Sequence, residues 1–397
     1  MKKSFFASMP KQVIVLGFVS LFTDFASEML YPVMPIFLVT YIGASMGVVG
    51  LIEGIAELTA GLLKGFFGAL SDKLGKRSIF VLIGYGLSGI VKPLPGIFPR
   101  LATVIVARIA DRIGKGIRNA PRDALLGSYT DSTTSGAVFG FHRGMDTAGA
   151  VAGPLTAILL LHYFPGNYTL IFVLAFIPSV LAIIFALKVK EVKILKESRQ
   201  KYSVKEFWHS APVEYKLLLT VFTIFSFANS SDVFLILKSR DIAKTDTIAI
   251  LGYVFYNIIY AVSSYPIGII ADRLGKKRVF IAGLFIFSIV YLGFALNDSF
   301  YFMWLLFTLY GIYASSTEGV SKAWISDLVE NKYRGTAIGL FTGMTSISIM
   351  FGSVFAGVLW DRFGAQIPFL ISSIISALVA AFLLLYSKKK GEVTASN

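Results

Sequence analysis

The apolar residues of this chain gather into about twelve blocks of roughly 18 to 27 residues, and about 20 apolar helical residues suffice to cross a bilayer. Hydrophobic residues make up 55% of the 397 positions and charged residues only 15%, whereas an ordinary globular domain carries about 25% charged residues. The sequence therefore predicts an all-α integral membrane protein with 12 transmembrane helices. The predicted spans begin near Gln12, Met46, Ser78, Leu101, Gly136, Leu170, Tyr215, Thr247, Val279, Phe302, Thr336 and Gln366.

The first apolar block is too long for a signal peptide and contains Asp24 and Glu28, so we expect it to stay in the mature protein as a helix. The chain has no cysteine, which excludes disulfides, cysteine-bound metals and thiol catalysis. A formal net charge of +14 would suit nucleic-acid binding, but the lysines and arginines fall mostly in loops on one side of a twelve-span topology. This bias predicts a cell-membrane protein with both termini in the cytoplasm and no nucleic-acid partner.

A loop motif occurs twice in the chain. Gly68-Ala-Leu-Ser-Asp72-Lys-Leu-Gly75-Lys76-Arg77 follows the second span, and Gly268-Ile-Ile-Ala-Asp272-Arg-Leu-Gly275-Lys276-Lys277 follows the eighth (272 − 72 = 200 residues later). We expect two six-helix halves at 1–188 and 213–388, a basic cytoplasmic linker at 189–212 and a cytoplasmic tail at 389–397. Ser203–Ser210 is expected to form a short interfacial helix, and a weaker copy of the motif runs from Gly357 to Gly364.

The repeated loop, the two six-span halves and the basic central linker resemble the major facilitator superfamily (MFS) of secondary transporters. Arg108 in the fourth span and Arg334-Gly335 after the tenth are also similar to that family. The blocks Thr23–Pro32, Asp111–Asp123 and Gly140–Asp146 resemble a large, poorly characterised prokaryotic branch, which indicates no particular substrate. The resemblance implies the MFS fold, two pseudo-symmetric halves around a central pocket, and alternating access.

The resemblance further implies that the loop closes the cytoplasmic gate. Gly68 and Gly75 would allow a tight turn, Asp72 would accept hydrogen bonds, and Arg77 would anchor the loop at the inner leaflet. The alternative is that the loop only fixes the topology. The predicted gating residues are Gly68, Asp72, Gly75, Arg77 and Arg122, with Gly268, Asp272, Gly275 and Lys277 in the second copy.

The fourth span carries a stripe of charge. Arg108, Asp111, Arg112, Lys115, Arg118 and Arg122 recur at three- and four-residue spacing, which places them on one helical face. Such a face must point at protein or water, because intramembrane charges are costly and usually functional. Guanidinium groups offer paired hydrogen bonds to a carboxylate or phosphate. The predicted substrate-binding residues are Arg108, Arg112, Lys115, Arg118, Glu57, His142, Arg143, Asn229 and Tyr256.

Several carboxylates accompany these cations. A carboxylate in low dielectric, whose basic partner arrives or leaves during the cycle, can bind and release a proton. The predicted proton-coupling residues are Asp24, Glu28, Glu53, Asp111 and Asp146. The alternative is an internal salt-bridge network that holds the helices in register, and the near balance of acids and bases indicates that about half of these positions are structural.

Two further patterns concern the direction of transport and the substrate. Gly140, Gly149 and Gly153-Pro154 resemble the fifth span of the family's antiporters, which favours export, although small residues at such spacing also serve plain helix packing. The second half has fewer charges: Asn229 and Asp232 in span seven, a tyrosine face in span eight at Tyr253, Tyr256 and Tyr260, and Glu318 and Lys322 in span ten, which we expect to pair. This asymmetry suits an amphipathic organic ion.

The sequence thus predicts a monomeric, proton-coupled exporter of a small organic substrate, anionic or amphipathic, that is not an enzyme and uses neither a cofactor nor a resident metal. One alternative is a proton-coupled importer of an organic anion or metal chelate. A divalent-metal transporter that uses His142 with carboxylates is another. A membrane-embedded transferase with His142 and Asp146 as acid and base is a remote third, since phosphate-loop and nucleophile signatures are missing from the sequence.

Overall fold

A computed structural model describes residues 10–129, 135–192, 204–330 and 333–395, and the regular structure in these ranges is helical. By their contacts the residues divide into two compact units. The first comprises Met1–Ala44 and Ile55–Arg199, and the second comprises Ser45–Gly54 and Gln200–Asn397. The division falls inside a single helix, α4.

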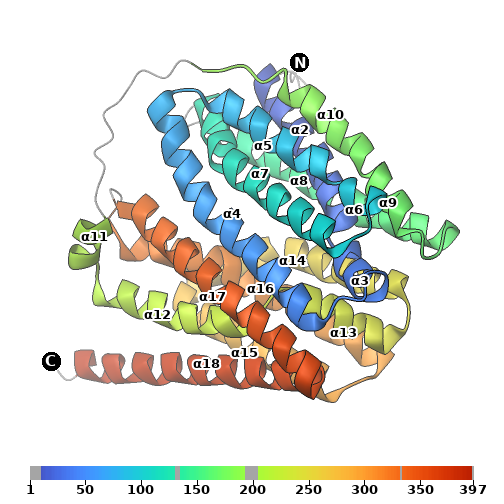
Figure 1. Cartoon of the computed structure of the whole chain (residues 1–397). Helices are drawn as coiled ribbons and strands as arrows, with labels where there is room; N and C mark the ends of the chain where they lie inside the picture. Colours follow the sequence, from blue (N-terminus) through green and yellow to red (C-terminus); the bar gives the residue numbers. More distant parts are fainter. Residues whose placement is uncertain (1–9, 130–134, 193–203, 331–332, 396–397) are drawn as a thin grey trace, which may run out of the picture. The chain divides into compact units, whose positions relative to one another are not determined.

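The first six spans are built from nine helices, which Figure 1 labels along the chain from blue to green. They are α2 (Lys11–Leu30), α3 (Val33–Thr40), α4 (Met46–Leu74), α5 (Arg77–Val91), α6 (Leu94–Ile97), α7 (Leu101–Ser128), α8 (Ser135–Tyr163), α9 (Tyr168–Leu174) and α10 (Phe176–Ala186). Within the first unit α2 packs along α8, α5 along α7, and α10 against α2 and α5.

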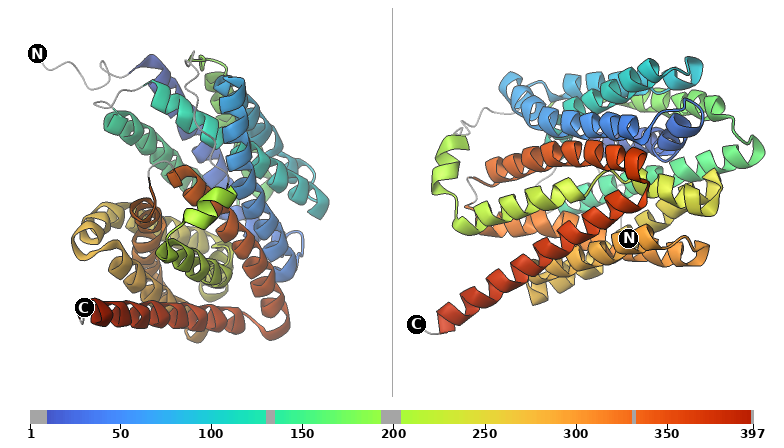
Figure 2. Two further views of the ribbon diagram at one scale, coloured as in Figure 1. Left: turned by 90° about the vertical axis from the view of Figure 1, so that its left-hand side faces the viewer. Right: turned by 60° about the horizontal axis from the view of Figure 1, so that its bottom comes forward.

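The last six spans follow a short connecting helix. The elements are α11 (Val204–Ser210), α12 (Val213–Ala228), α13 (Val233–Ala243), α14 (Asp246–Leu274), α15 (Lys276–Leu296), α16 (Phe300–Leu328), α17 (Arg334–Phe363) and α18 (Gln366–Ala395). Within the second unit α16 packs against α14 and α15, and α12 packs against α17. The long helix α18, red in Figure 2, runs along α15.

Ten helical stretches in the described ranges are long and apolar enough to cross a membrane. The helices α7 and α16, with 28 and 29 residues, complete the set of twelve. They are more polar because α7 carries the charged stripe and α16 is rich in tyrosine and hydroxyl side chains. Every predicted span start agrees with the structure to within three residues, the largest difference being Val279 against Lys276 (279 − 276 = 3). The prediction of twelve transmembrane helices is therefore confirmed.

Four of the spans are interrupted, and none of these breaks was predicted from the sequence. Span one breaks at Tyr31-Pro32 and span three at Lys92-Pro93, where a proline lacks the amide hydrogen that a continuous helix needs. Span six breaks at Ala175. Span seven breaks over 229–232, where the run Asn-Ser-Ser-Asp offers side chains that compete for backbone hydrogen bonds.

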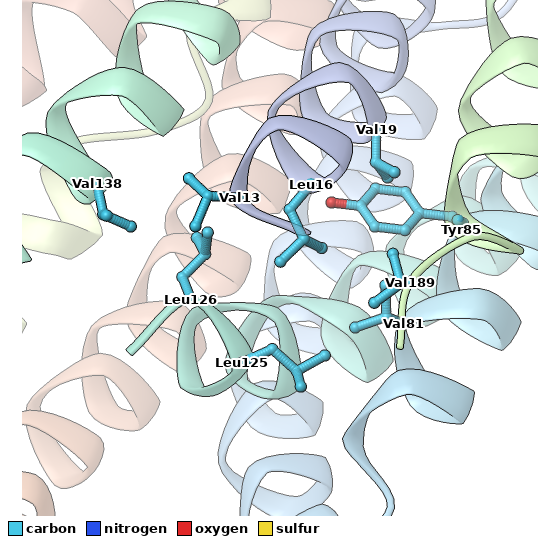
Figure 3. Packing of buried hydrophobic residues seen from close by; sticks show 10 residues of the cluster. Val13, Leu16, Val19, Val81, Tyr85, Leu125, Leu126, Val138 and Val189 are labelled. Carbon is cyan, nitrogen blue, oxygen red and sulfur yellow. The ribbon is translucent and has the colours of Figure 1, made fainter. Parts of the chain in front are cut away.

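A buried cluster of hydrophobic residues packs α2, α5 and α7 together at one end of the first unit, with further members on α8 and α10. Figure 3 shows Val13, Leu16 and Val19 of α2 against Val81 and Tyr85 of α5, with Leu125 and Leu126 of α7 closing the cluster. Each of these side chains is less than a tenth exposed. The cluster fixes the relative positions of α2, α5 and α7, the helices that carry most of the charged residues.

The connecting helix α11 confirms the short helix predicted over Ser203–Ser210, except that Ser203 lies outside the described residues. Phe207 is buried in a cluster with Tyr215 and Phe341, whereas its neighbour Trp208 is exposed. The Tyr215 hydroxyl donates to the Ala337 carbonyl oxygen at 2.9 Å, which ties α12 to α17. The helix is therefore anchored to the second unit through Phe207.

The glycines of the repeated loop play two different parts. Gly75, Gly275 and Gly364 have φ of +64°, +94° and +81°, and each directly follows the last residue of a helix, where glycine adopts the left-handed region at little cost. Gly68 and Gly268 instead lie inside α4 and α14. The expectation that Gly68 forms part of the turn was wrong, because the helix continues for six residues beyond it to Leu74.

Candidate functional site

The charged face of α7 is largely buried. Arg108, Arg112 and Arg118 are each less than a tenth exposed, whereas Lys115 between them is exposed. The guanidinium carbon of Arg108 lies 5.3 Å from the centre of the Tyr31 ring, beside the break in span one. That of Arg118 lies 4.6 Å from the centre of the Tyr85 ring. Stacking on aromatic rings holds both cations within the first unit.

Arg112 and Arg118 retain unused hydrogen-bonding capacity. Arg112 Nη2 lies 3.3 Å from Glu57 Oε1, and Arg118 Nη1 donates to the Gly84 carbonyl oxygen at 3.4 Å. The Nε atoms of both arginines are buried and have no hydrogen-bond partner among the described residues. Buried donors normally have partners, so these two atoms indicate a place where an acceptor is expected.

Asp111 forms an ion pair with a lysine that was not predicted from the sequence. Lys92 Nζ lies 3.1 Å from Asp111 Oδ1 and donates to Ser88 Oγ at 2.9 Å, while the Ser88 hydroxyl donates to Asp111. Lys92 is nearly fully buried and was not among the predicted site residues. The only sequence signal for Lys92 is its position inside an apolar span, one helical turn after Ser88. The pairing favours the salt-bridge interpretation for Asp111.

A second polar group joins α2, α7 and α8 around Ser20. The Ser20 hydroxyl is hydrogen-bonded to His142 Nε2 at 2.8 Å and accepts from Arg122 Nη1 at 3.4 Å. His142 Nδ1 lies 3.5 Å from Asp146 Oδ2, and Asp146 Oδ1 is buried without a partner among the described residues. Arg122 also donates to Asp123 Oδ1 at 2.8 Å. Ser20 was not predicted, because a lone serine in an apolar helix carries no sequence signal.

The remaining carboxylates of the first four spans lie on α2 and α4. Asp24 and Glu28 are half-buried on α2, one and two turns beyond Ser20. Glu57 on α4 is paired with Arg112, whereas Glu53 is nearly fully buried in the part of α4 that belongs to the second unit. Arg143 is exposed, in contrast to its neighbour His142. Among the predicted site residues, Glu57 therefore contacts Arg112, and His142 contacts Asp146.

The glycines of α8 pack against α2. A Cβ atom at Gly149 would lie 2.9 Å from the Phe25 amide nitrogen, and one at Gly153 would lie 2.6 Å from the Met29 amide nitrogen. Gly140, in contrast, has nothing within 4 Å of such a Cβ. Two members of the predicted antiporter pattern therefore serve close helix packing, which was the alternative interpretation.

The first copy of the loop motif is tied to the end of α7. Arg77 Nη2 donates to Asp72 Oδ1 at 2.6 Å, and Arg77 Nη1 donates to Ser128 Oγ at 2.9 Å and to the Ala124 carbonyl oxygen at 3.2 Å. The predicted gating residues Asp72 and Arg77 thus form one group, and Ser128 is an additional member.

A segment following α10 closes over the same end of the first unit. The Glu191 carboxylate accepts from the Ser78 amide and hydroxyl, both at 2.7 Å, and the Lys190 amide donates to Gln12 Oε1 at 2.9 Å. The Tyr129 hydroxyl donates to the Lys190 carbonyl oxygen. Partial burial, together with the negative charge of Glu191, raises the pKa of Tyr129.

The second copy of the motif pairs differently. Lys276 Nζ lies 3.5 Å from Asp272 Oδ1 and 2.6 Å from Asp327 Oδ2, while Lys277 Nζ lies 5.3 Å from the centre of the Tyr386 ring. Lys276, one position before the predicted Lys277, is therefore the residue that pairs with Asp272.

In the second unit a carboxylate is surrounded by tyrosines. Tyr256 Oη donates to Asp232 Oδ2 at 2.5 Å, and Tyr310 Oη donates to Asp232 Oδ1 at 2.6 Å. The predicted site residue Tyr256 thus meets Asp232, which was noted in span seven but not assigned a role. Asn229, also predicted, has a buried Oδ1 without a hydrogen-bond partner in the described part of the chain. Tyr260 donates to Glu318 Oε2 at 2.9 Å. In the described ranges, no group of three His, Cys, Asp or Glu side chains could hold a metal ion.

Comparison with known proteins gives the family. The model of the Major Facilitator Superfamily matches residues 16–251 and 238–396. An uncharacterized MFS-type transporter of Methanocaldococcus jannaschii is 35% identical over 382 residues, which covers 95% of this chain and 94% of that protein. A Na(+), Li(+), K(+)/H(+) antiporter of Planococcus maritimus is 30% identical over 130 residues, covering 31% of this chain and 30% of that protein.

Solved structures agree on the fold. A bacterial homolog to the human lysosomal transporter Spinster, in an inward-facing and unoccupied conformation, has a TM-score of 0.80 with 14% sequence identity, and the match covers 98% of both chains. The family model spans nearly the whole chain, the archaeal relative matches it end to end, and the twelve spans are those of the fold. This multi-pass membrane protein therefore belongs to the Major Facilitator Superfamily of transporters.

Proposed function

We propose that this transporter exports a small organic anion, or an amphipathic molecule with an anionic group, in exchange for protons. It would act as a monomer in the cell membrane, with both termini in the cytoplasm, halves at 1–188 and 213–388, and the segment 189–212 as their linker. The observation that carries the proposal is the pair of buried guanidinium groups on α7, Arg112 and Arg118, whose Nε atoms have no partner in the described residues.

An anionic group would satisfy either arginine. Their Cα atoms are six residues apart on one helix, which is about 9 Å along its axis. A buried donor that lacks a partner costs about 1–3 kcal/mol, and a carboxylate or phosphate can accept two parallel hydrogen bonds from Nε and Nη of one guanidinium. Arg108 and Lys115 lie on the same helix and would add attraction. Glu57, His142, Arg143, Asn229 and Tyr256 remain proposed contacts for the rest of the substrate.

The proton would be exchanged around Ser20. Asp146 has a buried oxygen without a partner in the described residues, and its other oxygen lies beside His142, which shares the Ser20 hydroxyl with Arg122. Protonation of Asp146 would change the net charge next to Arg122, and through this contact the α8 carboxylate would influence the α7 face. Asp24, Glu28 and Glu53 remain candidates, whereas the Lys92 pairing makes Asp111 the weakest one.

Export of the substrate in exchange for protons is supported by two observations. The glycines of α8 follow the spacing seen in the family's antiporters, and one distant relative is a cation/proton antiporter. The inner gate would involve Asp72 and Arg77. Gly68, Gly75 and Arg122 are the other proposed gating residues of the first unit. Gly268, Asp272, Gly275 and Lys277 would act as the counterpart group in the second copy of the motif.

Thermal stability of the purified full-length protein would test the anion site. The ligands are a set of aromatic and aliphatic carboxylates, organic phosphates and matching organic amines. We expect at least one anion to raise the melting temperature, because a ligand that binds only the folded state stabilises it. Arg112→Lys and Arg118→Lys keep the charge but remove Nε, and each should weaken this effect. Arg100→Lys, at the exposed start of the same helix, serves as the matched control.

The outcomes separate the alternatives. Stabilisation by amines alone, or by anions to the same extent in all three variants, would contradict the proposal. For an anion that passes this test, proteoliposomes containing a pH-sensitive dye report coupling. Its addition outside should move protons in the opposite direction through the wild-type protein, and movement in the same direction would indicate an importer.

A further inference from the structure

The break in span seven combines irregular backbone with buried polar groups. Helix α12 ends at Ala228 and α13 begins at Val233, so four residues with polar side chains interrupt a membrane span. Ser230 and Ser231 are each less than a tenth exposed. Non-helical backbone at membrane depth persists only where it is buried in protein or lines a site. Discontinuous helices of transporters commonly hold ions in this way.

Asp232 is held as a ligand and not as a helix cap. Its side chain makes no capping bond to α13, although Asp232 stands at the N-cap position. The first amides of α13 are hydrogen-bonded to backbone carbonyl groups instead. The Phe234 amide donates to the Ser231 carbonyl oxygen, and the Leu235 amide donates to the Asp232 carbonyl oxygen. The carboxylate points to α14 and α16, where Tyr256 and Tyr310 each donate one hydrogen bond. Two phenol donors stabilise the ionised form and fix its orientation.

Further oxygen atoms lie at the same break. Asn229 Oδ1 is buried and accepts no hydrogen bond from the described residues, which leaves a strong acceptor facing no donor. The C-terminal end of α12 carries partial negative charge from its last carbonyl groups. A cation bound at Asn229 and Asp232 would satisfy the amide oxygen and balance the charge of the carboxylate.

The corresponding break in the first unit has the opposite charge. The repeat offset of 200 residues maps Tyr31 onto Ser231 (231 − 31 = 200), so the two halves are interrupted at equivalent positions. In the first unit Arg108 of α7 lies over Tyr31 at the break. In the second unit Tyr310 of α16 donates to an anion there. The two halves therefore differ at their equivalent breaks. A guanidinium group lies at the break in the first unit, and a carboxylate lies at the break in the second.

From these contacts we propose that the span-seven break, with Asn229 and Asp232 as ligands, binds an alkali-metal cation. A single carboxylate with neutral oxygen donors suits a monovalent ion, whereas divalent ions usually have several carboxylates. Tyr256 packs edge to face on both Tyr253 and Tyr310, with ring centres 5.3 and 5.0 Å away, so aromatic rings lie close together beside the carboxylate. Asn229 and Tyr256, proposed above as further substrate contacts, belong to this site, whereas Arg112 and Arg118 do not, and its occupation requires no organic substrate.

The test measures the melting temperature of the purified full-length protein in sodium, lithium or potassium chloride. N-methyl-D-glucamine chloride replaces the salt to keep the ionic strength constant. We expect at least one alkali ion to raise the melting temperature, because an ion that binds only the folded protein stabilises it. Asp232→Asn should abolish the rise. Asp298→Asn is the control, since this exposed carboxylate of the same unit contacts Lys238 and lies outside the break.

Two milder variants keep the test decisive if Asp232→Asn does not fold. Asn229→Leu removes the amide oxygen, and Tyr310→Phe removes one donor that orients the carboxylate. Each should raise the midpoint concentration, for Tyr310→Phe by on the order of 10- to 100-fold as is typical for groups that orient a metal ligand. An alkali effect absent from the wild type, or unchanged in these variants, would overturn the proposal.

Discussion

Asp361, at the end of α17, caps the first turn of α4 at Gly47. Its Oδ2 accepts from the Gly47 amide at 2.7 Å, and its Oδ1 accepts from the preceding Met46 amide at 2.8 Å. Both residues belong to the second unit. A carboxylate here satisfies amides that have no partner within the helix and complements the positive end of the helix dipole. The aspartate of the weakest copy of the loop motif is therefore used as a helix cap.

Asp361→Ala should lower the free energy of unfolding by about 0.5–2 kcal/mol, the usual cost of losing a helix cap. Asp361→Asn, which keeps one acceptor oxygen, should lose less. Thermal unfolding of the purified protein measures both changes. Asp241→Ala provides the comparison, since this exposed carboxylate of the same unit lies near the end of α13. Equal losses at the two positions would argue against a capping role.

Lys92→Met should be among the most destabilising substitutions in the first unit. It leaves the Asp111 carboxylate without the ammonium group 3.1 Å away, and removing one partner of a buried ion pair typically costs about 3–5 kcal/mol. The double variant Lys92→Met with Asp111→Leu should recover much of this loss, because no charge is then left unpaired. Chemical unfolding monitored by tryptophan fluorescence gives the comparison.

The Lys92 and Asp111 variants also distinguish a structural role of Asp111 from a role in proton coupling. If Asp111 only holds α7 to α5, the double variant should retain pH-driven transport once a substrate is known. A stable double variant that has lost coupling would instead restore Asp111 to the proton pathway.

Gly149→Ala should destabilise the contact of α8 with α2. The added methyl group would lie 2.9 Å from the Phe25 amide nitrogen and still closer to the Leu21 carbonyl oxygen, and backbone atoms cannot move aside as a side chain can. Overpacking of this kind costs typically about 1–3 kcal/mol. Gly144→Ala on the same helix is the control, because nothing lies within 4 Å of its Cβ position. We expect that variant to be neutral or slightly stabilised, as alanine favours helix over glycine by about 1 kcal/mol. A similar loss at both positions would contradict close packing as the reason for Gly149.

Tyr129→Phe should lower stability in a pH-dependent way. The hydroxyl donates to the Lys190 carbonyl oxygen only while it is protonated. Burial and Glu191 raise the pKa of Tyr129 in the folded protein above its unfolded value of about 10, so its contribution is complete below that pH and is lost as the pH rises through the folded value. The difference in unfolding midpoint between wild type and variant should therefore be constant near neutral pH and shrink above about pH 10. A difference that grows with pH would have the wrong sign.

The sequence predicted the positions of the spans because burial in lipid requires long apolar blocks, which remain visible whatever the helices pack against. It predicted the buried charges of α7 for the same reason, since a stripe from Arg108 to Arg122 has no place facing lipid. The partners of those charges were predicted poorly. Lys92 and Ser20 stand alone in apolar helices, and only tertiary packing brings them to Asp111 and His142.

Backbone irregularities were predicted least well. Gly68 was expected in a turn that actually begins at Gly75, because the loop motif marks the end of a helix without giving its last turn. The break at Asn229–Asp232 was missed because periodicity describes side-chain faces, whereas this break depends on short polar side chains competing with the helix for its own hydrogen bonds.

The two equivalent breaks also differ in permanence. Pro32 has no amide hydrogen, so α2 and α3 cannot fuse into one regular helix whatever surrounds them. Residues 229–232 all keep their amide hydrogens, so no missing donor separates α12 from α13. The first half of this transporter therefore carries a joint fixed by proline, whereas the joint in the second half depends on its polar side chains.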